Sequence, residues 1–221
     1  NLKKHWFEED SHVIRIGTST IPSAYVLPEG LPAFRRQWPD VQFSIFQGDS
    51  QRVIDSLLMG SYEIGLVGTQ TQEDSLCFVP FLRDSMVLIT PVNERYQRWH
   101  GGYSIRDIAK EPLLVRQQGS GSRKWMETYL EQCGLRESEL RIMARLNDQE
   151  TIKNLVAGGL GLSIISAKAA ADFEREGKLL TFALPGAPVG RWLYLVHRKN
   201  DYFHRRTEQF VRFVQNYYAE E

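Results

Sequence analysis

Small hydroxyl, amide and glycine residues follow several apolar segments of this sequence, and their chemistry is suited to holding a ligand. They recur at five junctions between a predicted strand and the segment after it: Thr18 to Thr20, Gly48 to Ser50, Gly68 and Thr69, Gln117 to Ser122, and Asn147. A single Ser/Thr run at such a junction is usually an N-cap, which satisfies free N–H groups at a helix start. Ligands of parallel α/β sheets, however, bind beyond the carboxyl ends of the strands. Five such junctions on one predicted edge therefore favour a site for a small polar or anionic ligand.

The segment RQQGSGSRKW is glycine-rich but matches neither GxxxxGK[ST] nor GxGxxG. Two interpretations stay open. In the first, it is a flexible turn whose Ser120 or Ser122 caps the next helix. In the second, backbone N–H groups at the helix start form an anion-binding nest, and Arg123 pairs with the anion. Arg123 is equally compatible with a position facing solvent or a neighbouring helix.

The residue pattern predicts no catalytic site. A nucleophile, a base and an orienting group must lie within reach of one another, and the sequence has no GxSxG elbow. His197 and His204 belong to the last predicted strand and helix, where structural roles are expected. Asp148 and Glu150 are typical helix-start residues. The five histidines and two cysteines have no metal-ligand spacing, so we predict neither a metal nor a cofactor.

Composition limits the class of protein. The 221 residues are 42% apolar and 24% charged, with 27 basic and 27 acidic side chains, as in an ordinary globular protein of one or two domains. Balanced charge argues against a nucleic-acid or anionic-membrane surface within this chain. No apolar run approaches the roughly 20 residues of a membrane span. Cys77 and Cys133 are expected to be free thiols rather than a disulfide, which indicates a reducing, cytoplasmic setting.

Apolar periodicity predicts an α/β fold with largely parallel sheets. Strands are expected at 12–17, 41–46, 63–68, 112–117, 141–146, 161–166, 178–184 and 191–200, with two more inside 76–91. Helices are expected at 24–38, from Asp49 or Ser50 to Gly60, around 125–133 and 152–156, and at 167–175 and 203–218. This gives two α/β series and hence two lobes. The chain is expected to cross between them near 76–90 and again near 192–198.

The accumulated pattern resembles a known family, the effector-binding (regulatory) domain of LysR-type transcriptional regulators. Four groups of residues carry the resemblance: Leu27-Pro28 with Leu31, Phe34, Pro39 and Val41; Gly48, Leu57, Gly60 and YEIGLVG; ETIKNLVAGGLGLSII; and LYLVHRKNDYFHRRTEQFVRFV. Glu63 stands where the family usually has Asp, and Ser166 occupies the usual proline position. The GSGSR turn resembles the branch associated with sulfur or carbon assimilation.

The resemblance implies a type 2 periplasmic-binding-protein fold, with two Rossmann-like lobes joined by two crossover strands. Residues 1–11 would then be the end of a linker helix, 12–88 plus 192–221 lobe I, and 89–191 lobe II. The ligand-binding residues implied by the resemblance, together with the junctions above, are Thr18, Ser19, Thr20, Gln47, Asp49, Ser50, Gln51, Thr69, Gln117, Gln118, Gly119, Ser120 and Asn147.

The resemblance also implies a function. A small polar or anionic effector would bind in the inter-lobe cleft, and the oligomer (a dimer, or a tetramer when full length) would relay this to an N-terminal helix-turn-helix. Because the chain begins without an initiator Met, we interpret it as part of a longer protein that contacts DNA only through that missing domain. The alternatives are a periplasmic solute-binding protein and an enzyme of the same fold.

Overall fold

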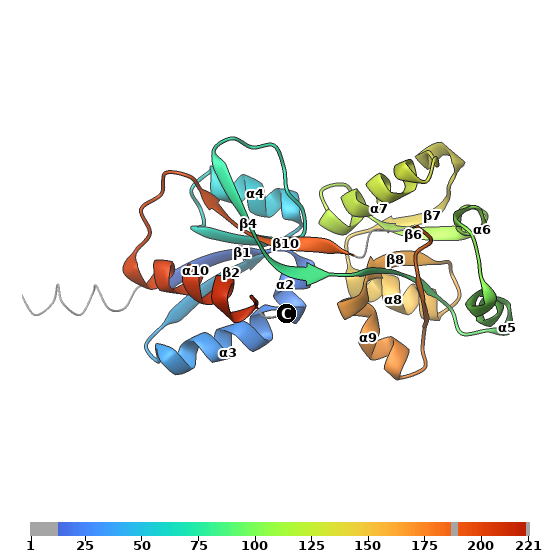
Figure 1. Ribbon diagram of the computed structural model, residues 1–221, viewed down its shortest axis with the longest axis horizontal. Helices are drawn as coiled ribbons and strands as arrows, with labels where there is room; N and C mark the ends of the chain where they lie inside the picture. Colours follow the sequence, from blue (N-terminus) through green and yellow to red (C-terminus); the bar gives the residue numbers. More distant parts are fainter. Residues whose placement is uncertain (1–12, 187–189, 220–221) are drawn as a thin grey trace, which may run out of the picture. The chain divides into compact units, whose positions relative to one another are not determined.

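The computed structural model describes residues 13–186 and 190–219, which form two compact units (Figure 1). Unit 1 contains the chain up to Arg83 and from Trp192 onward, and unit 2 runs from Asp84 to Arg191. The expected end of a linker helix at 1–11 lies outside the described residues. In 13–186 and 190–219, no helix combines the length and apolar character needed to cross a membrane.

Unit 1 is built on a five-stranded sheet of order β2-β1-β3-β10-β4. Its strands are β1 (Val13–Thr18), β2 (Gln42–Gln47), β3 (Ile64–Val67), β4 (Leu76–Asp84) and β10 (Arg191–Arg198). Strand β1 is parallel to both of its neighbours, with Thr18 opposite Gln47 on β2 and Leu66 on β3. Strand β10 is antiparallel to β3. The carboxyl ends of β1, β2 and β3 therefore lie on one edge of the sheet.

Helices cover both faces of this sheet: α4 lies on one face, and α3 and α10 on the other (Figure 1). The helices of unit 1 are α2 (Thr20–Tyr25), α3 (Leu27–Gln37), α4 (Ser50–Leu58) and α10 (Arg205–Tyr217). The α4 side depends on Gly65, because a Cβ there would lie 2.9 Å from Val53 Cγ1 and 2.7 Å from Val196 Cγ1. On the other face, Phe34 packs edge-on against Phe43 and Phe210.

The helix predicted over 24–38 is interrupted. It consists of α2 and α3, with Val26 as the C-cap of one and the N-cap of the other. Pro28 in the first turn of α3 explains the break, because proline has no N–H to donate to the preceding turn and restricts the residue before it. Proline is tolerated at the start of a helix, so α3 begins here instead.

Ile45 and Leu58 are among the apolar residues of predicted elements that are exposed rather than packed. Ile45 on β2 is 45% exposed, whereas Phe43 on the same strand is half-buried against α3 and α10. Strand β2 is an edge strand of the sheet, so it has a neighbouring strand on one side only. Leu58, at the last turn of α4, is 42% exposed. Periodicity identified both elements but did not predict how far their apolar side chains are buried.

Unit 2 contains two small sheets. Its strands are β5 (Met86–Thr90), β6 (Pro112–Arg116), β7 (Arg141–Leu146), β8 (Ser163–Ser166) and β9 (Leu180–Ala183). Strands β6 and β7 are parallel, as predicted. The prediction of largely parallel sheets is wrong for β5, which is antiparallel to both β8 and β9. Strand β5 lies between β8 and β9, which α9 connects along the chain, and both of these strands run opposite to it.

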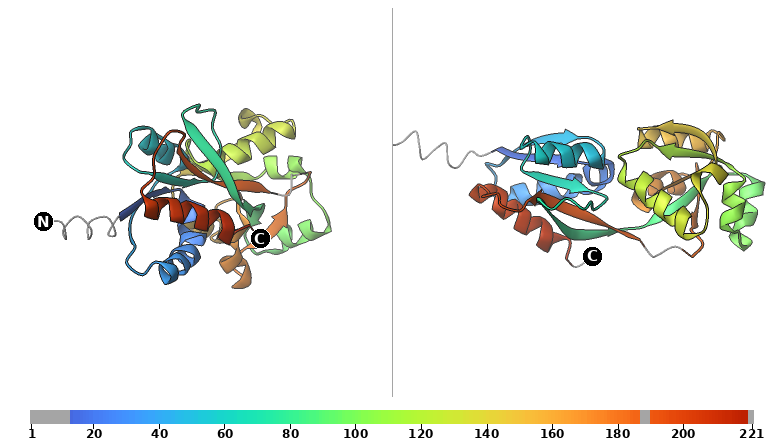
Figure 2. Two further views of the ribbon diagram at one scale, coloured as in Figure 1. Left: turned by 60° about the vertical axis from the view of Figure 1, so that its left-hand side comes forward. Right: turned by 90° about the horizontal axis from the view of Figure 1, so that it is seen from above.

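The helices of unit 2 surround these sheets. They are α5 (Glu94–Gln97), α6 (Ile105–Ala109), α7 (Gly121–Gln132), α8 (Gln149–Ala157) and α9 (Ala167–Arg175), with 3₁₀ turns η1 (Arg98–Gly101) and η2 (Glu137–Glu139). Helix α9 has the predicted bounds. Helices α5 and α6, which lie together at one end of unit 2 (Figure 2), were not predicted because one-turn helices leave no periodic signal.

Candidate functional site

The first candidate region is the edge of unit 1 where β1, β2 and β3 end. We call residues Thr18–Thr20, Gln47–Gln51 and Gly68–Thr69 the first edge. The Gly48 N–H donates to the Thr18 carbonyl at 3.1 Å, and the Ser19 N–H donates to the Leu66 carbonyl at 2.9 Å. These backbone bonds bring three predicted junctions together at one place.

The hydroxyl run on the first edge is not a conventional cap. Ser19 holds the N-cap position of α2, but its side chain makes no capping hydrogen bond. Thr18 is fully buried, and its Oγ1 donates to the Ser19 carbonyl at 3.1 Å. Thr20 begins the helix and is half-buried. The cap interpretation is therefore wrong for Ser19, and its hydroxyl is not committed to stabilising α2.

The next segment of the first edge is mostly engaged in structural contacts. The Asp49 carboxylate accepts from the Arg52 N–H at 2.9 Å and caps α4. Ser50 Oγ accepts from the Gly68 N–H at 3.4 Å, which links the start of α4 to the end of β3. The remaining side chains also have partners: Gln47 accepts from Ser23, Gln51 donates to Asp55, and Thr69 donates to the Gln70 carbonyl.

The second candidate region is the edge of unit 2 where β6 and β7 end. We call Arg116–Ser120 and Asn147–Gln149 the second edge. The Gln117 N–H donates to the Leu146 carbonyl at 3.1 Å, so the predicted residues Gln117 and Asn147 follow paired strand ends. Gly119 has φ +94°, a conformation that favours glycine. Ser120 caps α7 by accepting from the Arg123 N–H at 3.3 Å, as the turn interpretation predicts.

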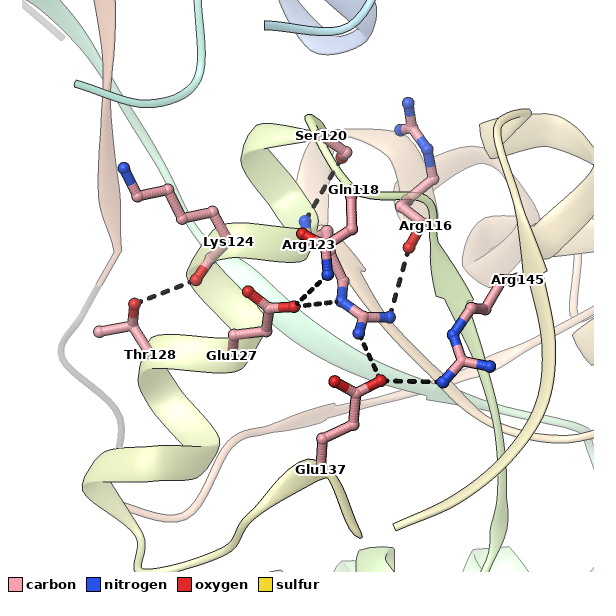
Figure 3. Close-up of polar contacts among 9 residues, drawn as sticks. All are labelled: Arg116, Gln118, Ser120, Arg123, Lys124, Glu127, Thr128, Glu137 and Arg145. Atoms are coloured by element: carbon pink, nitrogen blue, oxygen red, sulfur yellow. Dashed lines mark hydrogen bonds and ion pairs between the residues drawn. The ribbon is translucent and has the colours of Figure 1, made fainter. Parts of the chain in front are cut away.

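The Arg123 side chain is held inside unit 2 rather than presented to a ligand (Figure 3). Its Nε donates to Glu127 Oε1 at 2.7 Å, one terminal nitrogen donates to Glu137 Oε1 at 2.8 Å, and the other to the Arg116 carbonyl at 3.4 Å. The side chain is only 2% exposed. Of the alternatives left open, the interpretation as an anion partner is wrong, and the ion pairs explain why.

The ion-pair cluster around Arg123 also fixes the turn before α7. Gln118 Nε2 donates to the same Glu127 oxygen at 3.0 Å. Glu137 additionally accepts from Arg145 at 2.9 Å, and hydrogen bonds from Arg145 and Arg123 lower its pKa. Burial works against the charged Arg123, but the two glutamates outweigh it and raise the pKa of its guanidinium. The turn formed by the predicted residues Gln118–Ser120 is therefore held in place by contacts with this charged cluster.

Two polar residues of the second edge, and Thr71 two residues beyond the end of the first edge, were not predicted from the sequence. Arg116 and Gln149 are 7% and 4% exposed, and Arg116 Nη1 donates to Gln149 Oε1 at 3.5 Å. Among the described residues, neither Gln149 Nε2 nor the buried Thr71 Oγ1 has a hydrogen-bond partner. Gln149 directly follows Asn147 and Asp148, and Asp148 caps α8 by accepting from the Thr151 N–H at 2.9 Å. The helix-start position of Gln149 was the available signal.

The two departures from the family pattern both have structural partners. Ser166 Oγ donates to Asp84 Oδ1 at 2.7 Å, and Arg191 Nε donates to Asp84 Oδ2 at 3.0 Å. Glu63 accepts from Thr207 Oγ1 at 2.9 Å. Each replacement is thus accommodated by a hydrogen bond of its own.

Both edges present hydroxyl, amide and backbone N–H groups, which suit the binding of a small polar molecule rather than bond-breaking chemistry. Within 13–186 and 190–219, no three His, Cys, Asp or Glu side chains gather closely enough to hold a metal ion. His204 lies at the start of α10, where its Nδ1 accepts from the Arg206 N–H at 3.3 Å, a structural role.

Comparisons with known proteins agree with this geometry. The family model described as the LysR substrate binding domain matches residues 7–219. The uncharacterized HTH-type transcriptional regulator YeiE of Escherichia coli K12 is 27% identical over 205 residues, which are 93% of this chain and 68% of that protein. The effector-binding domain of QuiR in complex with shikimate is 19% identical, with a TM-score of 0.84, and the match covers 95% of this chain and 98% of that one. The regulatory domain of CcmR from Synechocystis PCC6803 in complex with 2-PG is 20% identical, with a TM-score of 0.82 and coverages of 93% and 97%.

Proposed function

We propose, for a chain that belongs to the LysR substrate binding domain family, that it is the ligand-sensing regulatory domain of a LysR-type transcriptional regulator. The family and the α/β fold predicted from the sequence are confirmed by the family match and by the structural similarity. The family assignment favours a regulator over a periplasmic solute-binding protein.

The ligand is a small polar or anionic metabolite. Two similar domains were solved with shikimate and with 2-PG, which supports a small-molecule effector here. The observation that carries the proposal is the convergence of β1, β2 and β3 at the first edge, where the Ser19 hydroxyl is not used to cap its helix. We propose Ser19 and Thr20 in unit 1, and Gln117 in unit 2, as residues that contact the effector.

Regulation proceeds by a shift between conformational states. An effector changes this equilibrium only by its difference in affinity for the two states, typically about 1–3 kcal/mol of coupling. Copies of the domain in an oligomer pass the change to the helix-turn-helix region of the regulator, which contacts DNA. The chain binds its effector without converting it, and the protein works in the cytoplasm.

A thermal-shift screen of small metabolites tests the ligand-binding role, because a ligand specific for the folded state raises the melting temperature. For a compound that binds, Ser19→Ala or Thr20→Ala should abolish the shift while leaving the ligand-free melting temperature nearly unchanged. Thr128→Ala is the matched control, since Thr128 belongs to neither edge and its hydroxyl donates to the Lys124 carbonyl within α7 (Figure 3).

Three results would contradict the proposal. Equal shifts in the Ser19→Ala variant, the Thr20→Ala variant and the parent would remove those residues from the site. Chemical conversion of the bound compound, detected by mass spectrometry, would indicate an enzyme. A compound that binds but leaves promoter binding by the full-length regulator unchanged would argue against regulation.

A further inference from the structure

We propose that Gln149 and Arg116 bind an oxyanion group of the effector, such as a carboxylate, sulfate or phosphate. This inference rests on the proposed function, since it names the chemistry of the group that the second edge receives. It concerns two residues that lie in unit 2 and that the sequence alone did not indicate.

Gln149 supplies the main evidence. It is the first residue of α8, and only 4% of it is exposed. Its amide oxygen accepts from Arg116, so the acceptor side of the amide is occupied. Its amide nitrogen has no acceptor among residues 13–186 and 190–219. Buried amide hydrogens are almost always paired in folded proteins, so an acceptor atom from a bound molecule is the natural complement.

Arg116 contributes charge and orientation at the same place. It ends β6, and its guanidinium points away from the Arg123, Glu127 and Glu137 cluster (Figure 3). Its Nη1 fixes the Gln149 amide so that the NH₂ group, rather than the oxygen, is directed at a ligand. A guanidinium of this kind carries five N–H donors and no acceptor.

The surrounding helix starts add further donors. Helices α7 and α8, of 12 and 9 residues, both begin on the second edge. The first N–H groups of a helix have no partner within the helix, and its dipole favours negative charge there. Asp148 is the opposing group, but its carboxylate accepts from both the N–H and the Oγ1 of Thr151. The two Thr151 hydrogen bonds and, to a smaller extent, the charge of Arg116 lower the pKa of Asp148, so its negative charge is partly balanced at this edge.

Small probes that differ only in charge test the inference directly. Acetate and acetamide are isosteric, and sulfate and phosphate extend the comparison to other oxyanions. We expect saturable shifts of the Gln149 side-chain NH₂ resonance in ¹H–¹⁵N spectra with at least one of the three anions at constant ionic strength. Acetamide should cause no saturable shift. Equal effects of acetamide and acetate, or no saturable shift with any anion, would overturn the proposal.

Gln149→Met removes the donors at nearly constant volume and should weaken anion binding by about tenfold, the loss expected for one hydrogen bond to a charged group. Gln132→Met, at the exposed end of α7, is the matched control and should bind like the parent. Unchanged anion affinity in the folded Gln149→Met variant would refute the assignment.

Failure of the oxyanion proposal can be distinguished from failure of the proposed function. Suppose that a metabolite from the screen requires Ser19 but binds equally to the parent and to Gln149→Met. The regulatory role then stands, and the oxyanion assignment fails. Anion binding at Gln149 without any metabolite that depends on Ser19 would support the oxyanion site and contradict the proposed effector site.

Discussion

The two edges hold the residues at their strand ends in place through different interactions. On the first edge, backbone hydrogen bonds connect the strand ends, and the side chains at the junction are mostly small and uncharged. On the second edge, the turn rests on a buried arginine held by two glutamates, and a second buried arginine faces an amide. Both edges lie at the ends of parallel strands. Strand pairing therefore determines where each edge lies, and the side-chain contacts determine how its residues are held.

This contrast assigns different consequences to mutation. A hydroxyl that makes no structural hydrogen bond is replaceable without loss of stability, whereas a buried charge that loses its partners is not. The first edge is therefore expected to separate binding from stability, while on the second edge the two are coupled. Four predictions, taken from the largest expected effect to the smallest, test this comparison.

Arg123→Met should have the largest effect. It removes the cation that Glu127 and Glu137 share and the donor to the Arg116 carbonyl. Removing one member of a buried pair typically costs 3–5 kcal/mol, but the two glutamate side chains are 38% and 46% exposed. Discounting for that exposure, we expect the free energy of unfolding to fall by about 2–3 kcal/mol. Urea denaturation measures it.

Arg136→Met provides the control for Arg123→Met. Arg136 pairs with Glu139 at 3.8 Å, and its side chain is 85% exposed, so its removal should leave stability within about 0.5 kcal/mol of the parent. If the two substitutions were equally mild, the second edge would not depend on a charged scaffold.

Asp148→Ala and Asp49→Ala form a matched pair with the next largest effect. Each aspartate caps a nine-residue helix by accepting from a backbone N–H at 2.9 Å, one helix on each edge. Loss of such a cap typically costs about 1 kcal/mol. Asp148 also accepts from Thr151 Oγ1 at 2.6 Å, and the two Thr151 hydrogen bonds lower its pKa. We therefore expect Asp148→Ala to cost about 1.5–2 kcal/mol by urea denaturation and Asp49→Ala about 1 kcal/mol. Equal losses would remove the energetic difference between the edges.

The sequence predicted the first edge better than the second for a physical reason. Parallel pairing places the carboxyl ends of neighbouring strands together, so Thr18 and Gln47 were predictable from strand order alone. The second edge depends on pairs separated in sequence, such as Arg123 with Glu137 and Arg116 with Gln149. No periodicity or motif specifies which distant carboxylate or amide a buried arginine will meet.

The same limit applies to the fold. Helix α9 was predicted with its correct bounds and α10 to within two residues, because their burial patterns are local. The break at Val26 depends on a proline, and the antiparallel direction of β5 depends on how the chain connects its strands. The one-turn helices α5 and α6 are too short to show a periodic pattern. Sequence periodicity therefore identified the elements, and tertiary context decided how they connect.

Glu137→Gln should have a smaller and pH-dependent effect. At pH 7 it replaces a carboxylate that accepts from Arg123 and Arg145 with a neutral amide, and we expect a loss of about 1 kcal/mol because Glu137 is partly exposed. The folded-state pKa of Glu137 is lowered. Its contribution is therefore complete above its unfolded-state pKa, about 4.3, and disappears as the pH falls through the lower folded-state value. Urea denaturation at pH 7 and in steps below pH 4.3 should show the two proteins converging. A constant difference would mean that charge is not the cause.

Ser19→Ala should have the smallest effect on stability and is the sharpest test of the comparison. Because the Ser19 side chain does not cap α2, its removal should change the free energy of unfolding by less than about 0.5 kcal/mol, in contrast to Asp49→Ala on the same edge. Urea denaturation of the two variants and the parent, without ligand, gives the values. A loss of about 1 kcal/mol for Ser19→Ala would mean that its hydroxyl stabilises the fold as a cap would, and the first edge would then couple stability to binding as the second edge does.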